Sequence, residues 1–184
     1  MEKLHIIFTA RMVREKGTLV LADAAELLRD DYHDKIDFWL CGRLSTTPNS
    51  LTEIELRSRC DGSYIQWLGF RTDIIDLLRR ASIVAFPSWY REGVPRSLIE
   101  ACAIGRPIVT TDSIGCRDTV VDGFNGYLVP VRDSVALADK LRILIDNPDM
   151  RRQMGANSRI IAERDFSIET VVNKHLEIYR RLVS

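Results

Sequence analysis

Residues 83–110 read IVAFPSWYREGVPRSLIEACAIGRPIVT, and this stretch decides the fold. Ile83–Phe86 and Pro107–Thr110 are short apolar runs of the length expected for strands. Between them, Pro95 fits the first position of a helix, and Gly105 is a typical helix stop. The stretch therefore predicts strand, helix and strand in succession, which is the repeating unit of a parallel sheet.

The same alternation extends along the chain. Four further apolar runs of strand length are Leu4–Thr9, Ile36–Cys41, Tyr64–Leu68 and Tyr127–Val129. Segments with apolar residues at helical spacing separate the runs, and the clearest of them hold Leu19, Val20, Ala24, Leu27 and Leu28, and then Ile74, Ile75, Leu77 and Leu78. We therefore expect an α/β fold with a Rossmann-like parallel six-stranded sheet and helices on both of its faces.

The strand pattern ends after Val131, and a helical C-terminal extension is expected. Its three helices are predicted at Ser134–Asp146, at Pro148–Glu163 with Asn147 as the capping residue, and from Ser167 to about Leu182. No internal repeat or low-complexity linker interrupts the sequence. Residues 1–184 are therefore interpreted as one domain.

Composition and charge limit the classes of function. The chain has 184 residues, of which 46% are apolar and 28% charged, as in an ordinary globular domain. At this length about 70% of the unfolded surface can be buried, so no disulfide or metal is needed for stability. The 26 basic and 26 acidic residues cancel, which does not favour nucleic acid as a partner. Any anion site has to be local.

The cysteines and the apolar runs bear on the cellular compartment. Cys41, Cys60, Cys102 and Cys116 form no CxxC pair and have no histidine at metal-ligand spacing, so we expect buried reduced thiols and no metal site. No signal-peptide pattern precedes Leu4, and no run approaches the ~18 apolar residues of a spanning helix. The expectation is a cytoplasmic protein, with peripheral association at the inner face of the membrane left open for a longer chain.

In a parallel sheet, ligands bind beyond the carboxyl ends of the strands, so the loops there carry the functional information. The loop after the first predicted strand has no glycine before Gly17, which excludes the dinucleotide fingerprint and the P-loop and argues against a dehydrogenase. It holds Arg11, Arg14 and Lys16 instead. A basic loop alone is more often solvated than bound to phosphate.

A sharper signal lies at the start of the helix expected from Pro95 to Ile104. The residue before it, Val94, has no side-chain oxygen to accept hydrogen bonds from the amides of Ser97 and Leu98. A phosphate would satisfy both amides and the positive end of the helix dipole, although water could do the same in a structural domain.

Two glutamates flank this helix start. Glu92 lies in the loop ahead of it, and Glu100 lies inside the helix about 8 Å further along its axis, at ~1.5 Å per residue. That separation argues against the close carboxylate pair of a glycosidase. Two separated acceptors around a phosphate site suit the hydroxyl groups of a nucleotide sugar.

These residues also carry a family resemblance. The segment EGVPRSLIEA at residues 92–101, together with Gly105-Arg106-Pro107-Ile108-Val109, the segment DGFNG at residues 122–126, and Arg11, Lys16 and Gly17, closely resembles the retaining glycosyltransferases of family four. The resemblance covers essentially the whole chain and implies the C-terminal, donor-binding half of a GT-B fold. It also implies that the N-terminal, acceptor-binding domain is absent from this chain.

The resemblance implies specific roles for the loop residues. Arg11 and Lys16 would contact the diphosphate of a nucleoside-diphosphate sugar, Glu92 the hydroxyls of the transferred sugar, and Glu100 the ribose. The remaining donor-binding positions are implied to be Gly93, Val94 and Pro95 against sugar and phosphate, the amides near Arg96, Ser97 and Leu98 on phosphate, and Gly69, Phe70 and Arg71 beside the base.

The resemblance further implies transfer with retention of configuration and without a metal, the departing diphosphate helping to deprotonate the acceptor. Charge builds on that diphosphate in the transition state, so Arg11 and Lys16 are expected to act there, together with Glu92, as the catalytic residues. A uridine-type donor and an acceptor that is a glycan or lipid-linked glycan are favoured, as in polysaccharide biosynthesis. The chain alone is expected to be inactive.

Some features depart from the family pattern or leave other functions open. The loop Cys41-Gly42-Arg43-Leu44 lacks a paired-glycine turn, which puts its contact with the nucleotide in doubt, and Arg14 and Arg91 are expected to be solvated. A nucleotide-sugar epimerase or phosphorylase of the same fold is an alternative. A non-catalytic nucleotide-binding domain is another.

Overall fold

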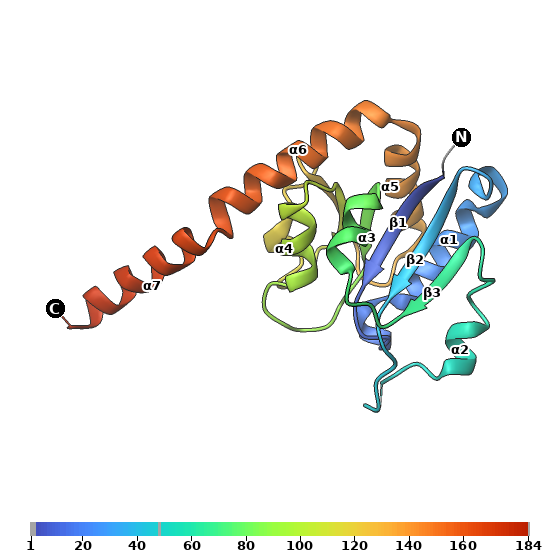
Figure 1. Cartoon of the computed structure of the whole chain (residues 1–184), viewed down its shortest axis with the longest axis horizontal. Helices are drawn as coiled ribbons and strands as arrows, with labels where there is room; N and C mark the ends of the chain where they lie inside the picture. Colours follow the sequence, from blue (N-terminus) through green and yellow to red (C-terminus); the bar gives the residue numbers. More distant parts are fainter. Residues whose placement is uncertain (1–2, 48, 184) are drawn as a thin grey trace.

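Six parallel strands form one sheet in the order β3-β2-β1-β4-β5-β6 in the computed structural model, which describes residues 3–47 and 49–183 (Figure 1). The strands are β1 (Leu4–Thr9), β2 (Ile36–Cys41), β3 (Ile65–Gly69), β4 (Ile83–Phe86), β5 (Ile108–Thr111) and β6 (Gly126–Val129). The Rossmann-like sheet expected from the sequence is thereby confirmed. Three strands have the predicted bounds, and the other three differ by one residue at one or both ends.

Strands β1 and β2 explain why the predicted strand segments are largely apolar. β1 pairs with β2 along its whole length, from Leu4 opposite Ile36 to Thr9 opposite Cys41, and it pairs with β4 on its other side. All six residues of β2 are buried. A parallel sheet covered on both faces is mostly apolar, since neither face contacts water, and the buried Asp37 of β2 is an exception that pairs with His5.

Helices cover both faces of the sheet (Figure 1). They are α1 (Thr18–Tyr32), α2 (Glu53–Arg57), α3 (Ile74–Arg80), α4 (Arg96–Ala103), α5 (Ser134–Asp146), α6 (Pro148–Asp165) and α7 (Ile168–Val183). α1 packs against α5, and α4 packs against α6. The strand order reverses between β1 and β4, which is the place where open α/β sheets bind ligands.

One short helix was not predicted, and two side chains that were expected on buried helix faces are exposed. The short helix α2 begins with a capping box, in which Thr52 and Glu55 bond each other's backbone amides, and the pattern T-x-x-E was a readable signal for it. Leu27 is 50% exposed and Ile75 is 39% exposed, although both were expected in apolar faces. Each lies next to an apolar residue in the chain, and positions 100° apart on a helix point in different directions, so one of them can face the solvent.

The C-terminal helix α7 extends away from the body of the domain and contacts it through α6 (Figure 1). Ser167 caps its first turn, accepting a hydrogen bond from the amide of Thr170 at 3.1 Å. Its apolar residues are exposed, namely Ile168, Val171, Val172, Leu176, Ile178, Tyr179 and Leu182. These residues leave an uncovered apolar face on α7.

Two further expectations concern the cysteines and the membrane. All four cysteines are free thiols, and Cys60 is only half-buried, whereas Cys41, Cys102 and Cys116 are buried as expected. Cys60 lies just past the exposed end of α2, which leaves it partly open to water. No helix in the described part of the chain has both the length and the apolar character required to span a membrane.

A matched pair of leucines tests the packing of the sheet. Leu40 in β2 is fully buried, so Leu40→Ala is expected to lower the free energy of unfolding by about 2–5 kcal/mol. Leu27→Ala removes the same atoms from a half-exposed position on α1 and is expected to change it by less than about 1 kcal/mol. Urea denaturation of both variants measures the difference. Equal losses would contradict the described burial.

Candidate functional site

Two loops meet at the carboxyl edge of the sheet, one following β1 and the other following β4. The carbonyl of Glu15 accepts hydrogen bonds from the amides of Trp89 at 2.8 Å and Tyr90 at 3.1 Å. The hydroxyl of Ser88 donates to the same carbonyl at 3.2 Å. The basic loop and the loop ahead of α4 are therefore held together, as the sequence analysis required.

Gly17 makes this close approach possible. Its φ of +85° lies in the left-handed region that favours glycine. A Cβ atom at this position would lie 2.1 Å from the carbonyl oxygen of Pro87. Both the backbone conformation and the space therefore require a glycine between the 3₁₀ turn Arg14–Lys16 and α1.

A buried ion pair joins the same two loops. The ammonium of Lys16 contacts a carboxylate oxygen of Glu92, and it lies 4.9 Å from the ring centroid of Tyr90. Lys16 is only 7% exposed, whereas the side chain of Glu92 is 28% exposed. A lysine ammonium has three donors, and the contact with Glu92 uses one. The structure thus brings together a cation and a carboxylate that were expected to contact different parts of a ligand.

The start of α4 differs from the prediction by one residue. Pro95 is the capping residue and Arg96 the first helical residue, so Pro95 is not the first position and Val94 is not the cap. The amide of Leu98 donates to the carbonyl of Pro95 at 3.0 Å and is not free, contrary to the expectation. Within residues 3–47 and 49–183, the amides of Arg96 and Ser97 have no hydrogen-bond partner. The free donors are these two.

The loop ahead of α4 rests on the loop that follows β5. A Cβ atom on Gly115, whose φ is +83°, would lie 2.3 Å from the carbonyl oxygen of Gly93. The hydroxyls of Thr111 and Ser113 both donate to the carbonyl of Ser88, the latter at 3.0 Å. Contacts beneath the loop therefore fix its backbone.

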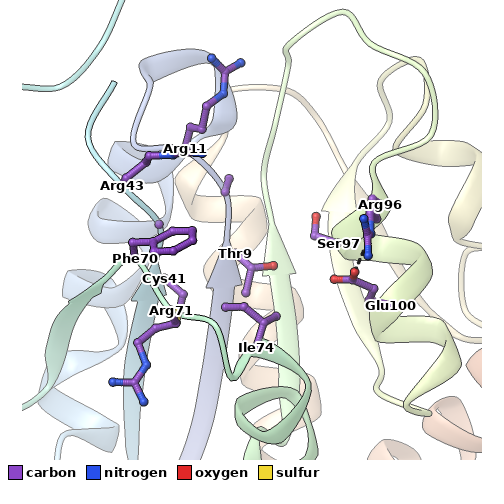
Figure 2. Close-up of a pocket in the computed structure, with 12 residues that line it drawn as sticks. Thr9, Arg11, Cys41, Arg43, Phe70, Arg71, Ile74, Arg96, Ser97 and Glu100 are labelled. Carbon is purple, nitrogen blue, oxygen red and sulfur yellow. Dashed lines mark hydrogen bonds and ion pairs between the residues drawn. The ribbon is translucent and has the colours of Figure 1, made fainter. Parts of the chain in front are cut away.

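A cavity of about 280 Å³ lies beside these loops, between the end of β1 and α4 (Figure 2). Its lining residues are Thr9, Ala10, Arg11, Cys41, Gly42, Arg43, Phe70, Arg71, Ile74, Arg96, Ser97 and Glu100. Six of these were predicted as site residues, namely Arg11, Phe70, Arg71, Arg96, Ser97 and Glu100. The predicted residues outside this lining are Lys16, Gly69, Glu92, Gly93, Val94, Pro95 and Leu98.

The other six lining residues were not predicted, and the pairing of β1 with β2 accounts for two of them. Thr9 pairs with Cys41, so these two side chains end adjacent strands on the same face of the sheet. A Cβ atom on Gly42 would lie 1.7 Å from the carbonyl oxygen of Ala10, which shows how closely the loops after β1 and β2 approach. Gly42 and Arg43 therefore line the cavity, although the missing paired-glycine turn had put this loop in doubt.

The cavity lining is electropositive. It contains four arginines and one carboxylate, Glu100, whose oxygen accepts from Nε of Arg96 at 2.8 Å (Figure 2). The carboxylate of Asp73 binds Arg71 and raises the pKa of its guanidinium. The guanidinium of Arg43 lies 5.4 Å from the ring centroid of Phe70, which is 65% exposed. An exposed aromatic face and several cations suit an anion that carries a planar ring.

Other groups near the cavity offer less chemistry. Burial raises the pKa of the Cys41 thiol to about 12, so Cys41 carries no thiolate nucleophile at neutral pH. Arg14 forms an ion pair with Glu55 and does not line the cavity. Among the described residues, no group of histidine, cysteine, aspartate and glutamate side chains is arranged to hold a metal ion. The side chains that line the cavity are therefore suited to binding an anion.

Comparison with known proteins agrees with this geometry. Residues 3–147 match the family described as "Glycosyl transferases group 1". Among curated relatives, the chain is 27% identical over 182 residues to the N,N'-diacetylbacillosaminyl-diphospho-undecaprenol alpha-1,3-N-acetylgalactosaminyltransferase of Campylobacter jejuni, covering 99% of this chain and 46% of that protein. It is 34% identical over 167 residues to the D-inositol 3-phosphate glycosyltransferase of Corynebacterium kroppenstedtii, covering 86% of this chain and 36% of that protein.

A solved structure is similar to this chain over almost its whole length. The Anabaena protein HepE in complex with UDP and glucose superposes with a TM-score of 0.80 at 25% identity, covering 99% of this chain and 48% of that chain. The present chain thus spans about half the length of this structure and less than half of the two curated relatives.

A comparison of Gly17 with Gly62 distinguishes the stability cost of a positive φ from the cost of a steric clash where the two loops meet. Gly17 and Gly62 both have positive φ, of +85° and +78°, but a Cβ atom on Gly62 would meet nothing within 4 Å. Gly62→Ala is expected to lower the free energy of unfolding by about 1–2 kcal/mol. Gly17→Ala is expected to lower it by at least ~1 kcal/mol more, because of the clash with Pro87. Urea denaturation of the two variants gives the comparison, and equal losses would show that the loops are not in contact.

Proposed function

The chain belongs to the group 1 glycosyl transferases, and from this premise we propose that it binds the nucleoside-diphosphate sugar from which a longer enzyme transfers a sugar to an acceptor. One observation carries the proposal. The two free amides at the start of α4, those of Arg96 and Ser97, lie at a cavity that the loop after β1 supplies with Arg11. Free amides at the positive end of a helix, with an arginine opposite, suit a diphosphate.

We propose that the buried pair of Lys16 and Glu92 adjoins the reacting end of the donor. Lys16 keeps two donors after its contact with Glu92, and these suit oxygens of the diphosphate. Glu92 has the more exposed side chain of the two, with acceptor oxygens for the hydroxyls of the transferred sugar. In this arrangement Glu92 also stabilises the charge of a lysine that has little contact with water.

The nucleoside end of the donor is assigned to the opposite side of the cavity. Glu100 would accept from the ribose hydroxyls, for which Arg96 orients one of its oxygens. Gly69, Phe70 and Arg71 would border the base, with the exposed ring of Phe70 as a stacking surface. The sugar and the phosphate would lie along Gly93, Val94 and Pro95. Leu98 would make no direct contact with the donor, since its amide already donates to Pro95 within α4.

Transfer is proposed to proceed with retention of configuration and without a metal. Negative charge increases on the diphosphate as the bond to the sugar breaks, so Arg11, Lys16 and the α4 amides would stabilise the transition state more than the ground state. The diphosphate would accept the acceptor's proton on the same face. Arg11, Lys16 and Glu92 are the residues proposed to act at the reacting atoms.

The acceptor is proposed to bind to a second domain. The chain spans 46% of the Campylobacter relative and 36% of the Corynebacterium relative, and the apolar face of α7 is uncovered. A partner domain packed against that face would close the other side of the cavity, so residues 1–184 alone are proposed to bind donor without transferring sugar. The name of the Campylobacter relative supports a lipid-linked glycan as the acceptor.

A nucleotide screen tests the proposal. UDP is favoured as the nucleotide because HepE binds UDP and glucose. At a hundredfold excess over Kd, UDP or a UDP-sugar is expected to stabilise the domain by about 2.7 kcal/mol, which corresponds to a rise in Tm of roughly 5–10 °C. Thermal unfolding with UDP, GDP, ADP and the matching nucleotide sugars ranks the bases. If none of them shifts Tm, the chain is not a donor-binding domain.

Two arginines of one loop provide a matched test of the site. Arg11→Gln removes a cation from the cavity lining and is expected to weaken nucleotide binding about 10- to 100-fold. Arg14→Gln removes a cation of the same loop that pairs with Glu55 outside the cavity, and it is expected to leave the affinity unchanged. Glu100→Gln is expected to weaken binding of UDP but not of pyrophosphate, because the proposed contact is to ribose. Calorimetric titration measures all three. Similar affinities for the two arginine variants would remove the assignment.

A further inference from the structure

A second cavity, of about 320 Å³, lies at the opposite edge of the sheet, where the strands begin. Leu4 begins β1, Ser82 precedes β4, and Pro107 precedes β5, and all three line this cavity. The connection between α5 and α6 lies at the same end of the sheet, near the label N (Figure 1). The cavity is therefore separate from the one proposed to bind the donor.

Three arginines and no acidic residue line the second cavity. They are Arg106, which lies between α4 and β5, and Arg151 and Arg152 in the first turns of α6. Asp149 pairs with Arg152 and Asp146 interacts with the charge of Arg151, but neither aspartate lines the cavity. Like charges gathered in one concave surface repel one another, and a bound anion relieves the repulsion.

Arg106 is the least compensated of the three. Its Nη2 donates to the carbonyl of Arg79 at 2.6 Å, while its Nε is buried and has no hydrogen-bond partner among residues 3–47 and 49–183. Burial lowers the pKa of its guanidinium. A guanidinium has five N–H donors; one binds the carbonyl of Arg79 and the Nε donor is buried, which leaves the others on the two Nη atoms for a ligand.

The α6 arginines also keep donors free. Nη1 of Arg151 binds the carbonyls of Leu144 and Ile145 at the end of α5, which fixes the side chain. Burial and the neighbouring charge of Arg152 lower the pKa of Arg151. Arg152 contacts Asp149, and both side chains are well exposed, at 73% and 91%. An exposed ion pair of this kind holds its partners weakly, so Arg152 can turn toward a ligand.

The N-terminus of α6 borders this cavity through Pro148, whereas Asp149 and Met150 line a neighbouring cavity. Asn147 occupies the capping position, as predicted, but its side-chain amide donates to the carbonyl of Ile143 at 2.7 Å and makes no cap. In the described part of the chain, the amides of Asp149 and Met150 have no acceptor. The positive end of this 18-residue helix thus borders the three arginines.

We propose that this second cavity is a binding site for a phosphate group carried by a small organic molecule or a lipid headgroup. The volume of 320 Å³ lies at the lower end of the range for small-molecule sites, about 300–1,000 Å³, and it accommodates a phosphate with a small substituent. Arg106 and Arg152 bind the phosphate oxygens from two sides, and Ser82 supplies a hydroxyl. Occupancy joins the start of α6 to the loop before β5.

A titration with inorganic phosphate tests the site. The amide NMR spectrum of residues 1–184 is recorded at each phosphate concentration, at constant ionic strength. The amides of the lining residues Ser82, Gly105 and Arg152 are expected to shift and saturate, independently of those of Arg96 and Ser97 in the first cavity. Sodium chloride at the same ionic strength is expected not to reproduce the shifts. Shifts that are absent, or equal in chloride, would overturn the proposal.

Matched arginine variants locate the binding. Arg152→Gln, at an exposed position, is expected to weaken phosphate binding about tenfold or more. Arg142→Gln breaks a comparable exposed pair, with Asp139 on α5, outside the cavity, and is expected to have no effect. Arg106→Lys keeps the charge but loses the planar fork and is expected to bind phosphate more weakly than the native chain. Equal affinity in the Arg142 and Arg152 variants would exclude the cavity as the site.

Vesicles distinguish the two sources of the phosphate. Phosphatidylcholine vesicles with one quarter phosphatidylglycerol are mixed with the native chain and with the Arg152→Gln variant, and bound protein is measured by flotation. Binding that the substitution abolishes identifies a lipid headgroup. Response to free phosphate without vesicle binding identifies a soluble phosphorylated ligand. UDP binding reports only on the donor site, whichever cavity carries the substitution. The two proposals can therefore fail independently of each other.

Discussion

The carbonyl of Glu15 is the constraint on which the cavity geometry depends. It accepts hydrogen bonds from the amides of Trp89 and Tyr90 and from the hydroxyl of Ser88, so it joins two loops that are more than seventy residues apart in the chain. The buried contact between Lys16 and Glu92 repeats the connection with charges. Because the loops share these bonds, a displacement of either one moves the cations relative to the free amides of α4.

The fold was predictable because its signals are local. Each buried strand is a continuous apolar run, and the six runs reappear as six strands with bounds that differ by at most one residue at either end. α2 was overlooked because it has five residues and little apolar content, although its capping box was visible. Leu27 and Leu28 show where the pattern fails, since adjacent apolar residues on a helix do not reveal which of them faces the core.

The candidate site was only partly predictable, since its cavity is built from residues brought together by strand register. Arg11, Ser97 and Glu100 were identified from loop chemistry and from a family resemblance, whereas Thr9 and Cys41 became evident only from the pairing of β1 with β2. The free amides lie at Arg96 and Ser97, because the helix begins one residue later than Pro95. The contact of Lys16 with Glu92 depends on side-chain placement and had no sequence signal.

The order of the strands affects how this chain can fold during synthesis. β1 is made before the other five strands of this sheet, yet it lies in the middle of the sheet and pairs with β4, which starts at residue 83. α1 packs against α5, which starts at residue 134. As the chain leaves the ribosome, the apolar surface of the first fifty residues of this sequence stays incompletely covered until most of the remaining residues have been synthesised. During that interval the exposed surface is a target for chaperones.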